Sequence, residues 1–293
     1  MAHTFQVGAP NPFDFAGCVR RFSRYGGDPV NRVEDGALLR VIRVDGRPAV
    51  YRAAPAPGGM TMTIARPGDE PAARADVTHR FAFALDPGPV GLLARRDPGF
   101  APHWAAHRGL RPPLTPDPFE QIVTSITAQQ VNLRWATETR RRLVAAYGDP
   151  VAHDGRLLRA FPEPGRLAAV DPAELRALQF TGAKAASIVA LARAAAGGEL
   201  DGLDALADEA IVAALVRHRG IGPWTARWFL ARCLGRPGAV AWDDLGVRKA
   251  IGIVYLGGTA AAPVAEVAAI TGTWGDAANW AMHVLLESLA AVP

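Results

Sequence analysis

The chain has 293 residues, of which 49% are hydrophobic and 20% are charged, and this length allows two or three compact units with their own cores. It contains no run of about 18 apolar residues and no basic start followed by an apolar block, so we expect neither a transmembrane helix nor a secretory signal. The formal net charge is +4, and all but two of the 32 Lys and Arg residues are arginines. This charge fits a phosphate-rich partner without requiring one.

The two cysteines, Cys18 and Cys233, lie far apart in the sequence. They are too few for a disulfide framework, and their spacing fits neither a zinc site nor an iron–sulfur cluster. We therefore expect two reduced, structural cysteines in a cytoplasmic protein, with no side-chain metal site and no cofactor.

The first part of the chain, which we assign to residues 1–87, is typical of an α+β unit. Residues 11–27 predict a short helix that ends at Gly26-Gly27. The apolar runs on either side of Asp45-Gly46 predict a β-hairpin. Residues 60–65 and 77–85 also have the alternating character of strands, so we expect an antiparallel sheet of about four strands.

From about residue 88 the pattern becomes helical, and we assign residues 88–293 to an all-α body of two helical lobes with a cleft between them. Residues 95–118 are polar and rich in proline, and we expect them to form the crossing between the two units. Beyond this crossing, apolar residues recur at spacings near i, i+3 and i+4. These helical patterns cover residues 117–130, 132–148, 183–198, 208–220, 223–235, 245–258 and 279–292.

The stretch “RGIGP”, residues 219–223, joins two of these helices by a very tight turn. Gly220 lies where a C-cap glycine would lie, Ile221 would fill the space between the helices, and Pro223 fits the first position of the second helix. The two glycines allow the backbone to approach a partner closely, and the free N–H groups of the second helix favour an anion such as a DNA phosphate. A purely structural turn between two core helices explains the same residues.

The second helix of this pair has two tryptophans opposite its apolar face. At about 100° per residue, Trp224 and Trp228 lie together on one side of the helix. They either pack against another helix or wall a cleft in which a nucleobase stacks, with cation–π attraction for a charged base. The apolar face comprises Ala226, Phe229, Leu230 and Cys233.

A pair of aspartates follows at the start of the next helical pattern. Either Asp243 or Asp244 opens this helix, and N-capping explains one aspartate but not two in a row. A carboxylate in this position is stabilised in its ionised form by the helix dipole and the free N–H groups. An ionised carboxylate is what a reaction with a developing sugar cation would need.

Three motifs resemble the helix-hairpin-helix base-excision glycosylases. The turn “RGIGPWTA” followed by the “WDDLGV” acid is the first, “PFEQIVTSITAQQVNLRWA” is the second, and “LRALQFTGAKAASIVALARAAAGGEL” is a looser third. The N-terminal pattern “NPFDF … ALLRV” resembles the added sheet domain of the DNA-3-methyladenine glycosylase II family. The resemblance covers nearly the whole chain and implies an α+β fold, in which an N-terminal antiparallel sheet domain precedes an all-α helix-hairpin-helix glycosylase body.

The resemblance also implies roles for particular residues. Gly220, Ile221 and Gly222 match the phosphate-binding hairpin, and Thr225 is expected to bind DNA with them. Asp244, rather than Asp243, matches the catalytic acid because the family pattern is Asp-x-x-Val/Ile. Some members of the family hold a monovalent cation on carbonyl groups of the hairpin, which would require no side-chain ligand.

Further residues are expected at the flipped base and in the space that it leaves. Gln130 falls where relatives insert a wedge residue into the vacated stack, and Gln129 would contact the DNA beside it, although glutamines at a helix end are commonly just solvated. Trp224 and Trp228 are expected to line the base pocket. Trp274 and Phe22 are further candidates for this pocket.

Trp224 stands where the bifunctional lyases of the superfamily have a lysine. No amine is available there to form a Schiff base, so the resemblance implies a monofunctional hydrolase that removes alkylated purines, such as 3-methyladenine and 7-methylguanine, from duplex DNA by base flipping. The alternatives are a glycosylase for uracil or hypoxanthine and a non-catalytic DNA-binding protein. We expect a monomer that acts in the cytoplasm, at the nucleoid, on damaged double-stranded DNA and on no membrane.

Overall fold

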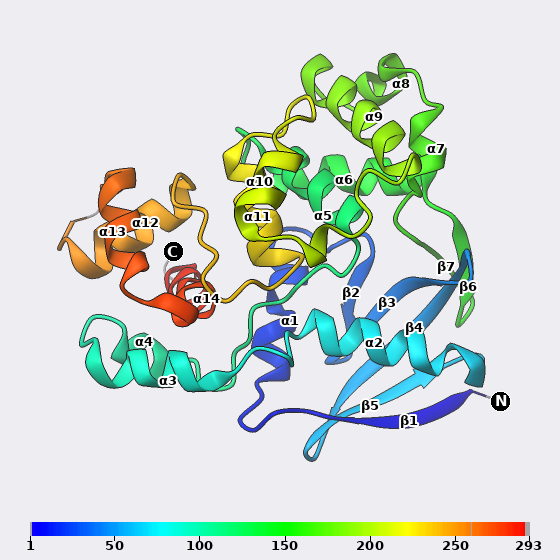
Figure 1. Cartoon of the computed structure of the whole chain (residues 1–293). Helices are drawn as coiled ribbons and strands as arrows, with labels where there is room; N and C mark the ends of the chain where they lie inside the picture. Colours follow the sequence, from blue (N-terminus) through cyan, green and yellow to red (C-terminus); the bar gives the residue numbers. More distant parts are fainter. Residues whose placement is uncertain (1, 259, 291–293) are drawn as a thin grey trace.

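The computed structural model describes residues 2–258 and 260–290. A five-stranded antiparallel sheet with the strand order β1-β5-β4-β3-β2 comes first, and a largely helical body follows (Figure 1). This confirms the predicted fold class. The strands of the sheet are His3–Gly8 (β1), Asn31–Glu34 (β2), Ala37–Val44 (β3), Arg47–Ala56 (β4) and Gly59–Ile64 (β5).

The hairpin predicted at Asp45-Gly46 joins β3 and β4. Both turn residues have positive φ, at +50° and +75°, as a two-residue type I′ turn requires, and Val44 pairs with Arg47 across it. Two of the five strands, β1 and β2, were not predicted, and the same kind of turn at Asp35-Gly36 joins β2 to β3. β1 completes the sheet by pairing with β5.

The predicted strand at residues 77–85 is wrong, because the helix Glu70–Arg80 (α2) runs through its first half. Ala73, Val77 and Phe81 are fully buried at the spacing i, i+4, i+8, so helical periodicity prevails over the alternating “RFAFAL” run. Figure 1 shows α2 lying across the sheet. The helix thus covers one face of the sheet rather than extending it.

The remaining chain forms helices interrupted by one small hairpin, so the predicted all-α body is helical except for two short strands, Pro150–His153 (β6) and Arg156–Arg159 (β7). Leu158 packs from this hairpin against Leu39 and Val41 of β3.

None of the helices in the described part combines the length and the apolar character that crossing a membrane requires. The other helices are Phe15–Arg24 (α1), Pro87–Arg96 (α3), Ala101–Ala106 (α4), Pro118–Ala128 (α5), Leu133–Tyr147 (α6), Pro164–Ala168 (α7), Pro172–Ala177 (α8), Gly182–Ala196 (α9), Asp208–Leu215 (α10), Pro223–Arg232 (α11), Leu245–Tyr255 (α12), Val264–Gly272 (α13) and Ala278–Leu289 (α14), with short 3-10 turns at Pro67–Asp69, Leu203–Ala205 and Gly275–Ala277.

Two large hydrophobic cores organise these elements. One joins the sheet, α1, α2 and α3 to the C-terminal helices α12–α14, and the other is formed by helices α5 to α11. Helices α3 and α4 therefore lie with the C-terminal helices, on the left in Figure 1. Trp228 packs against both cores. The functional candidates of α11 thus lie at the junction of two packed units, while the predicted domain boundary at residue 87 stays a prediction.

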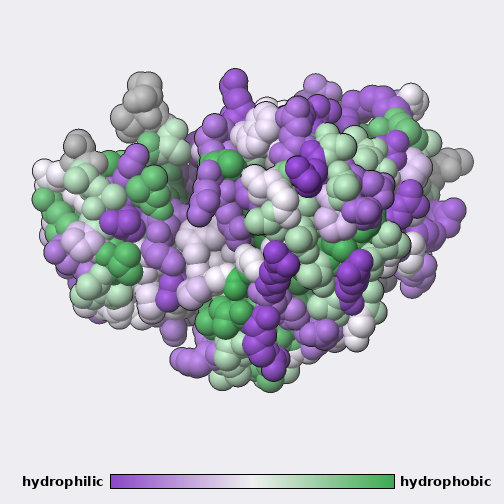
Figure 2. Space-filling view, turned by 90° about the horizontal axis from the view of Figure 1, so that it is seen from above, coloured by the Kyte–Doolittle hydropathy of each residue, from purple (hydrophilic) through white to green (hydrophobic). Residues whose placement is uncertain are grey.

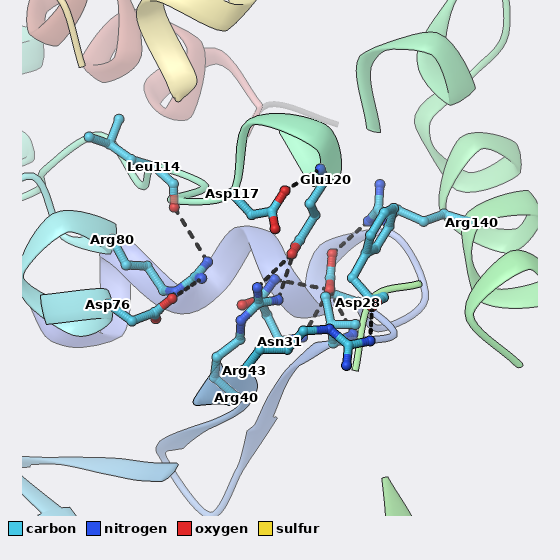
Figure 3. A network of polar contacts seen from close by, with 12 residues as sticks. Asp28, Asn31, Arg40, Arg43, Asp76, Arg80, Leu114, Asp117, Glu120 and Arg140 are labelled. Carbon is cyan, nitrogen blue, oxygen red and sulfur yellow. Dashed lines mark hydrogen bonds and ion pairs between the residues drawn. The ribbon is translucent and has the colours of Figure 1, made fainter. Parts of the chain in front are cut away.

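A buried network of ion pairs joins the sheet to the helical body (Figure 3). Arg40 of β3 contacts Glu120 of α5 at 2.6 Å between Nη2 and Oε2, and both side chains are only 5% exposed. Asp28 contacts Arg140 of α6 at 2.6 Å. These pairs fix α5 and α6 against the sheet, and the loop that joins the two helices begins at Gln129.

Candidate active site and DNA-binding hairpin

The predicted tight turn lies between α10 and α11. Helix α10 ends at Leu215, so the prediction that Gly220 caps this helix is wrong. Gly220 instead has a φ of +77° at the point where the chain turns back. Ile221 is 4% exposed and belongs to the second core. Gly222 is the N-cap of α11, and Pro223 is its first residue as predicted.

The two glycines of the turn have different physical roles. A Cβ atom on Gly220 would lie 2.1 Å from Oγ of Ser187 in α9, so this glycine is required by its φ and by packing inside the protein. A Cβ atom on Gly222 would meet nothing within 4 Å. Gly222 therefore has room for a side chain and Gly220 does not, although a partner can approach the backbone of both, since Gly220 is exposed and Gly222 half-buried.

Gln129 ties the end of α5 to this hairpin. Its Nε2 atom donates to the carbonyl oxygen of Gly220 at 2.9 Å and to Oγ1 of Thr225 at 3.1 Å. Thr225 is 1% exposed, so the prediction that it contacts DNA is wrong: its hydroxyl is covered by the protein. The structure thus shows Gln129 supporting the hairpin, and its predicted contact with DNA stays a prediction.

Gln130 lies at the tip of the loop that Gln129 anchors. Its side chain is exposed, and its φ is +54°, a left-handed conformation that costs free energy in a residue with a Cβ atom. Asn132 then caps α6 by accepting a hydrogen bond from the N–H of Trp135 at 2.8 Å. The exposed position of Gln130 is compatible with a wedge, and this role stays a prediction.

The carboxylate of Asp244 contacts both tryptophans of α11. Its Oδ2 atom accepts hydrogen bonds from Nε1 of Trp224 at 3.0 Å and from Nε1 of Trp228 at 3.2 Å. Its Oδ1 atom accepts from the N–H of Val247 at 3.1 Å, which makes Asp244 the N-cap of α12. The two rings meet edge to face with their centroids 6.5 Å apart. Two half-buried indoles and one helix terminus therefore fix the carboxylate.

Asp243 has a separate partner, which explains the second aspartate. Its Oδ1 atom lies 3.1 Å from Nη1 of Arg227 on α11. The guanidinium carbon of Arg227 lies 4.7 Å from the ring centroid of Trp242. This ion pair connects the turn before α12 to α11, and it leaves Asp244 as the aspartate that faces the indoles.

Sequence reasoning missed a buried arginine next to these groups. Arg232 is 5% exposed, and its guanidinium carbon lies 5.1 Å from the ring centroid of Trp228. Its Nη1 atom donates to Oδ1 of Asn279 in α14 at 2.5 Å. The signal was present in the sequence, since residues 224, 228 and 232 lie on one face of a helix.

Of the other two aromatic candidates, Trp274 lies inside a hydrophobic core. Trp274 is 3% exposed and packs between Phe100 and Tyr255 in the first core, with ring centroids 6.5 Å and 5.8 Å away. It is thus a core residue rather than a pocket wall. Phe22 lies half-buried on α1 against the core that Trp228 also contacts, and its place in the base pocket stays a prediction.

The hairpin carbonyls are the groups that a monovalent cation would use. The carbonyl oxygen of Gly220 accepts from Gln129, and that of His218 accepts from the N–H of Ile221 at 3.1 Å. Both already have one partner, so a cation would have to use their second lone pairs, and its binding stays a prediction. Within the described residues, no group of three or more His, Cys, Asp or Glu side chains could hold a metal ion.

Seen from above, the surface is hollowed between the part that holds α12 and α13 and the larger part on the right (Figure 2). Helices α11 and α12 approach this hollow from its two sides (Figure 1). The arrangement thus offers a fixed carboxylate between two aromatic rings, next to a helix terminus with an open backbone. Such a site can stabilise a cation at the carboxylate and an anion at the hairpin.

Comparisons with known proteins agree with this geometry. The profile of the HhH-GPD superfamily base excision DNA repair proteins matches residues 123–271. The chain is 34% identical over 176 residues to a DNA-3-methyladenine glycosylase of Bacillus subtilis, covering 59% of this chain and 58% of the relative. It is 32% identical over 244 residues to a probable bifunctional transcriptional activator/DNA repair enzyme AlkA of Mycobacterium tuberculosis, covering 82% of this chain and 48% of the relative.

The chain thus spans only about half of the length of these curated relatives. In fold it is similar to the solved structure of a 3-methyladenine DNA-glycosylase from Archaeoglobus fulgidus, with a TM-score of 0.89, 22% identity, and coverage of 98% of this chain and 99% of that chain. The profile match includes α11, the hairpin before it and the start of α12. The chain therefore belongs to the HhH-GPD superfamily of base excision DNA repair proteins.

Proposed function

We propose that the protein is a monofunctional DNA glycosylase that hydrolyses the N-glycosidic bond of alkylated purines, of the 3-methyladenine and 7-methylguanine type, in duplex DNA. The observation that carries this proposal is the position of Asp244, fixed by two indole N–H groups and by the N-terminus of α12. The names of the relatives from Bacillus subtilis and Archaeoglobus fulgidus support the substrate class.

The reaction needs a negative charge close to the sugar. As the bond between C1′ and the base nitrogen breaks, its electron pair leaves with the base, and positive charge builds on the deoxyribose. Asp244 stabilises this charge and accepts a proton from the water whose oxygen attaches to C1′. A fixed group of this kind lowers the barrier by roughly 3–4 kcal/mol. A cationic alkylated base leaves as a neutral molecule, so no general acid is required.

The groups around Asp244 support hydrolysis without a covalent intermediate. Trp224 occupies the place next to the carboxylate, and its N–H group donates to it. An indole nitrogen cannot form a Schiff base. The DNA would be held by the backbone of Gly222 at the start of α11, while Gln130 would enter the stack that the flipped base leaves.

The test is the release of free bases from duplexes that each contain one defined lesion: 3-methyladenine, 7-methylguanine, hypoxanthine or uracil. The proposal expects rapid release of the two alkylated purines and an intact abasic strand. Release of uracil or hypoxanthine alone would favour the other glycosylase class, and tight binding with no release would favour a non-catalytic protein. We also propose that the enzyme is a cytoplasmic monomer, at the nucleoid, and chromatography at several concentrations tests the oligomeric state.

A further inference from the structure

A buried cation lies against the ring of Trp228. The guanidinium carbon of Arg232, one helical turn beyond Trp228 on α11, lies 5.1 Å from the centroid of the indole. The arginine is 5% exposed, whereas the indole is half-buried. One side of the Trp228 ring is therefore already in contact with a positive charge that belongs to the protein.

The hydrogen-bond partners of this cation are uncharged. Arg232 donates to Oδ1 of Asn279 at 2.5 Å and to the carbonyl oxygen of Ala231 at 3.3 Å. The amide nitrogen of Asn279 donates to the carbonyl oxygens of Ala231 and Arg236, both at 3.0 Å. These two bonds orient the amide of Asn279, so its oxygen faces Arg232. No ion pair of Arg232 is formed with any residue in the ranges 2–258 and 260–290.

A buried cation without an ion pair costs several kcal/mol, so it calls for a physical explanation. Burial and the positive charge of Arg21 lower the pKa of Arg232, while the charges of Glu287 and Asp244 act to raise it. His283 of α14 is also buried near this charge, and burial together with Arg232 lowers its pKa well below the usual range. The imidazole of His283 is thus neutral. Asp244, which faces Trp228 from the N-terminus of α12, is one of the two negative charges, with Glu287, that act on Arg232.

The same indole connects Arg232 to Asp244. A cation over one face of an aromatic ring withdraws electron density from its π-system, so the ring attracts a second cation less. The same withdrawal makes the N–H group a stronger donor, because hydrogen-bonded groups polarise one another at low dielectric. The N–H group of Trp228 donates to Oδ2 of Asp244. No arginine or lysine of the described residues lies over the Trp224 ring in this way.

We propose that Arg232 makes Trp228 a positioning residue for Asp244 instead of a wall that attracts cationic bases, and that Trp224 provides the charge-sensitive face of the pocket. This inference rests on the proposed glycosylase function. It changes the expectation from sequence, in which both tryptophans would recognise the charge of an alkylated purine. It also assigns a role to a buried charge that the fold alone does not explain.

The first test compares Arg232→Met with Arg232→Lys. Methionine keeps an unbranched apolar side chain and removes the charge, whereas lysine keeps a charge. The measurement is kcat/KM for base release from matched duplexes with one 7-methylguanine, which is cationic, or one hypoxanthine, which is neutral. The ratio of 7-methylguanine to hypoxanthine release should rise about 3- to 10-fold in Arg232→Met and stay near the wild-type ratio in Arg232→Lys.

Two tryptophan variants provide matched controls. Trp228→Phe keeps a ring and removes the N–H donor, so the release of both lesions should fall by the same factor. Trp224→Leu removes the charge-sensitive face, so the release of 7-methylguanine should fall more than that of hypoxanthine. An unchanged ratio in Arg232→Met, or a selective loss of 7-methylguanine release in Trp228→Phe, would overturn the inference. So would a uniform loss of both activities with a lower Tm in Arg232→Met, since that is a purely structural effect.

A second measurement does not depend on activity. In a ¹H–¹⁵N spectrum of the full chain, the indole N–H signal of Trp228 is the one lost in Trp228→Phe. Arg232→Met should move this signal upfield because the donor becomes weaker, while Arg232→Lys should move it less. An unmoved signal contradicts the polarisation of Trp228. A wild-type protein that releases none of the tested bases overturns the proposed function instead, and the spectrum still decides whether Arg232 acts on Trp228.

Discussion

The side-chain amide of Gln129 donates to the carbonyl oxygen of Gly220 at 2.9 Å. This hydrogen bond joins the end of α5 to the turn before α11, two segments 91 residues apart in the sequence. Because both segments are proposed to contact the DNA, the bond fixes the spacing between the phosphate-binding backbone and the wedge loop. The hairpin and the loop that holds Gln130 therefore form one preorganised surface.

Single alanine substitutions can distinguish the roles of Gly222 and Gly220 in the hairpin. Gly222→Ala should leave the Tm unchanged, because the added Cβ atom meets nothing within 4 Å. It should weaken binding to all DNA sequences equally, by about tenfold, which corresponds to the loss of one charge-assisted hydrogen bond to phosphate. Fluorescence anisotropy with duplexes of several sequences measures this effect.

Gly220→Ala is the matched control for this prediction. Its Cβ atom would collide with Ser187, and its φ of +77° disfavours alanine, so the main effect should be a lower Tm. If Gly222→Ala binds DNA as well as the wild type does, the backbone of the hairpin does not hold a phosphate.

Gln130→Gly tests the wedge. Glycine adopts a φ of +54° without strain, so the stability should stay within about 1 kcal/mol of wild type or rise. Base release should fall in duplex DNA, because nothing fills the space of the flipped base. The loss should be smaller in single-stranded DNA, where no stack has to be opened. Equal losses on both substrates would argue against a wedge.

Much of the fold follows from local patterns in the sequence. The Asp45-Gly46 hairpin, the helix α1 and the long helices of the body are all predicted by turn residues and periodicity. The same Asp-Gly signal occurs at Asp35-Gly36 and Asp154-Gly155, and it could have revealed β2 and the β6–β7 hairpin. Residues 77–85 were predicted wrongly because alternating aromatic residues follow a helix that buries one face on the sheet.

The candidate site was predictable in part. The helix face of Trp224 and Trp228 and the N-cap position of Asp244 follow from helical geometry and capping, whereas the burial of Thr225 and Trp274 depends on which distant elements cover them. The contact between the indole N–H groups and Asp244 also depends on how the 12-residue segment between α11 and α12 turns back. No local pattern encodes that turn.

The buried pair of Asp28 and Arg140 predicts a pH-dependent stability. Burial acts to raise the pKa of Asp28, but Arg140 and the N–H groups of Val30 and Asn31 outweigh it and lower this pKa below its ordinary value. Asp28 therefore contributes stability above the unfolded pKa of about 3.9, and the contribution is lost as the pH falls through the lower folded pKa. Asp28→Asn should cost about 3 kcal/mol at pH 7, because it leaves the buried Arg140 without its partner.

Urea unfolding of the wild type and of Asp28→Asn between pH 7 and the lowest pH at which both stay folded measures this difference. The gap between the two proteins should narrow only below about pH 4. The surface ion pairs of Glu138 with Arg141 and Arg142, whose side chains are 31%, 55% and 28% exposed, provide the control, since Glu138→Gln should change the stability by less than about 1 kcal/mol. A gap that is constant down to acid pH would show that the ion pair contributes no pH-dependent stability.

Asp244→Asn should abolish base release, with a loss of at least about 100-fold, while duplex binding is largely kept. The asparagine oxygen can still cap α12 by accepting from the N–H of Val247, but no negative charge faces the sugar. Single-turnover release of 7-methylguanine and anisotropy with the same duplex measure the two quantities. The amide NH₂ group would then face the N–H groups of Trp224 and Trp228, which at present donate to a carboxylate oxygen.

Two unpaired indole donors make the Asp244→Asn protein less stable by about 1–3 kcal/mol, so its activity has to be measured well below its Tm. Asp243→Asn provides the matched control: its carboxylate is exposed and contacts only Arg227 among the described side chains. This variant should keep near wild-type base release, because the lost ion pair lies on the surface. If Asp243→Asn is inactive and Asp244→Asn is active, the catalytic carboxylate is Asp243, and the two indoles fix a capping residue rather than the reacting acid.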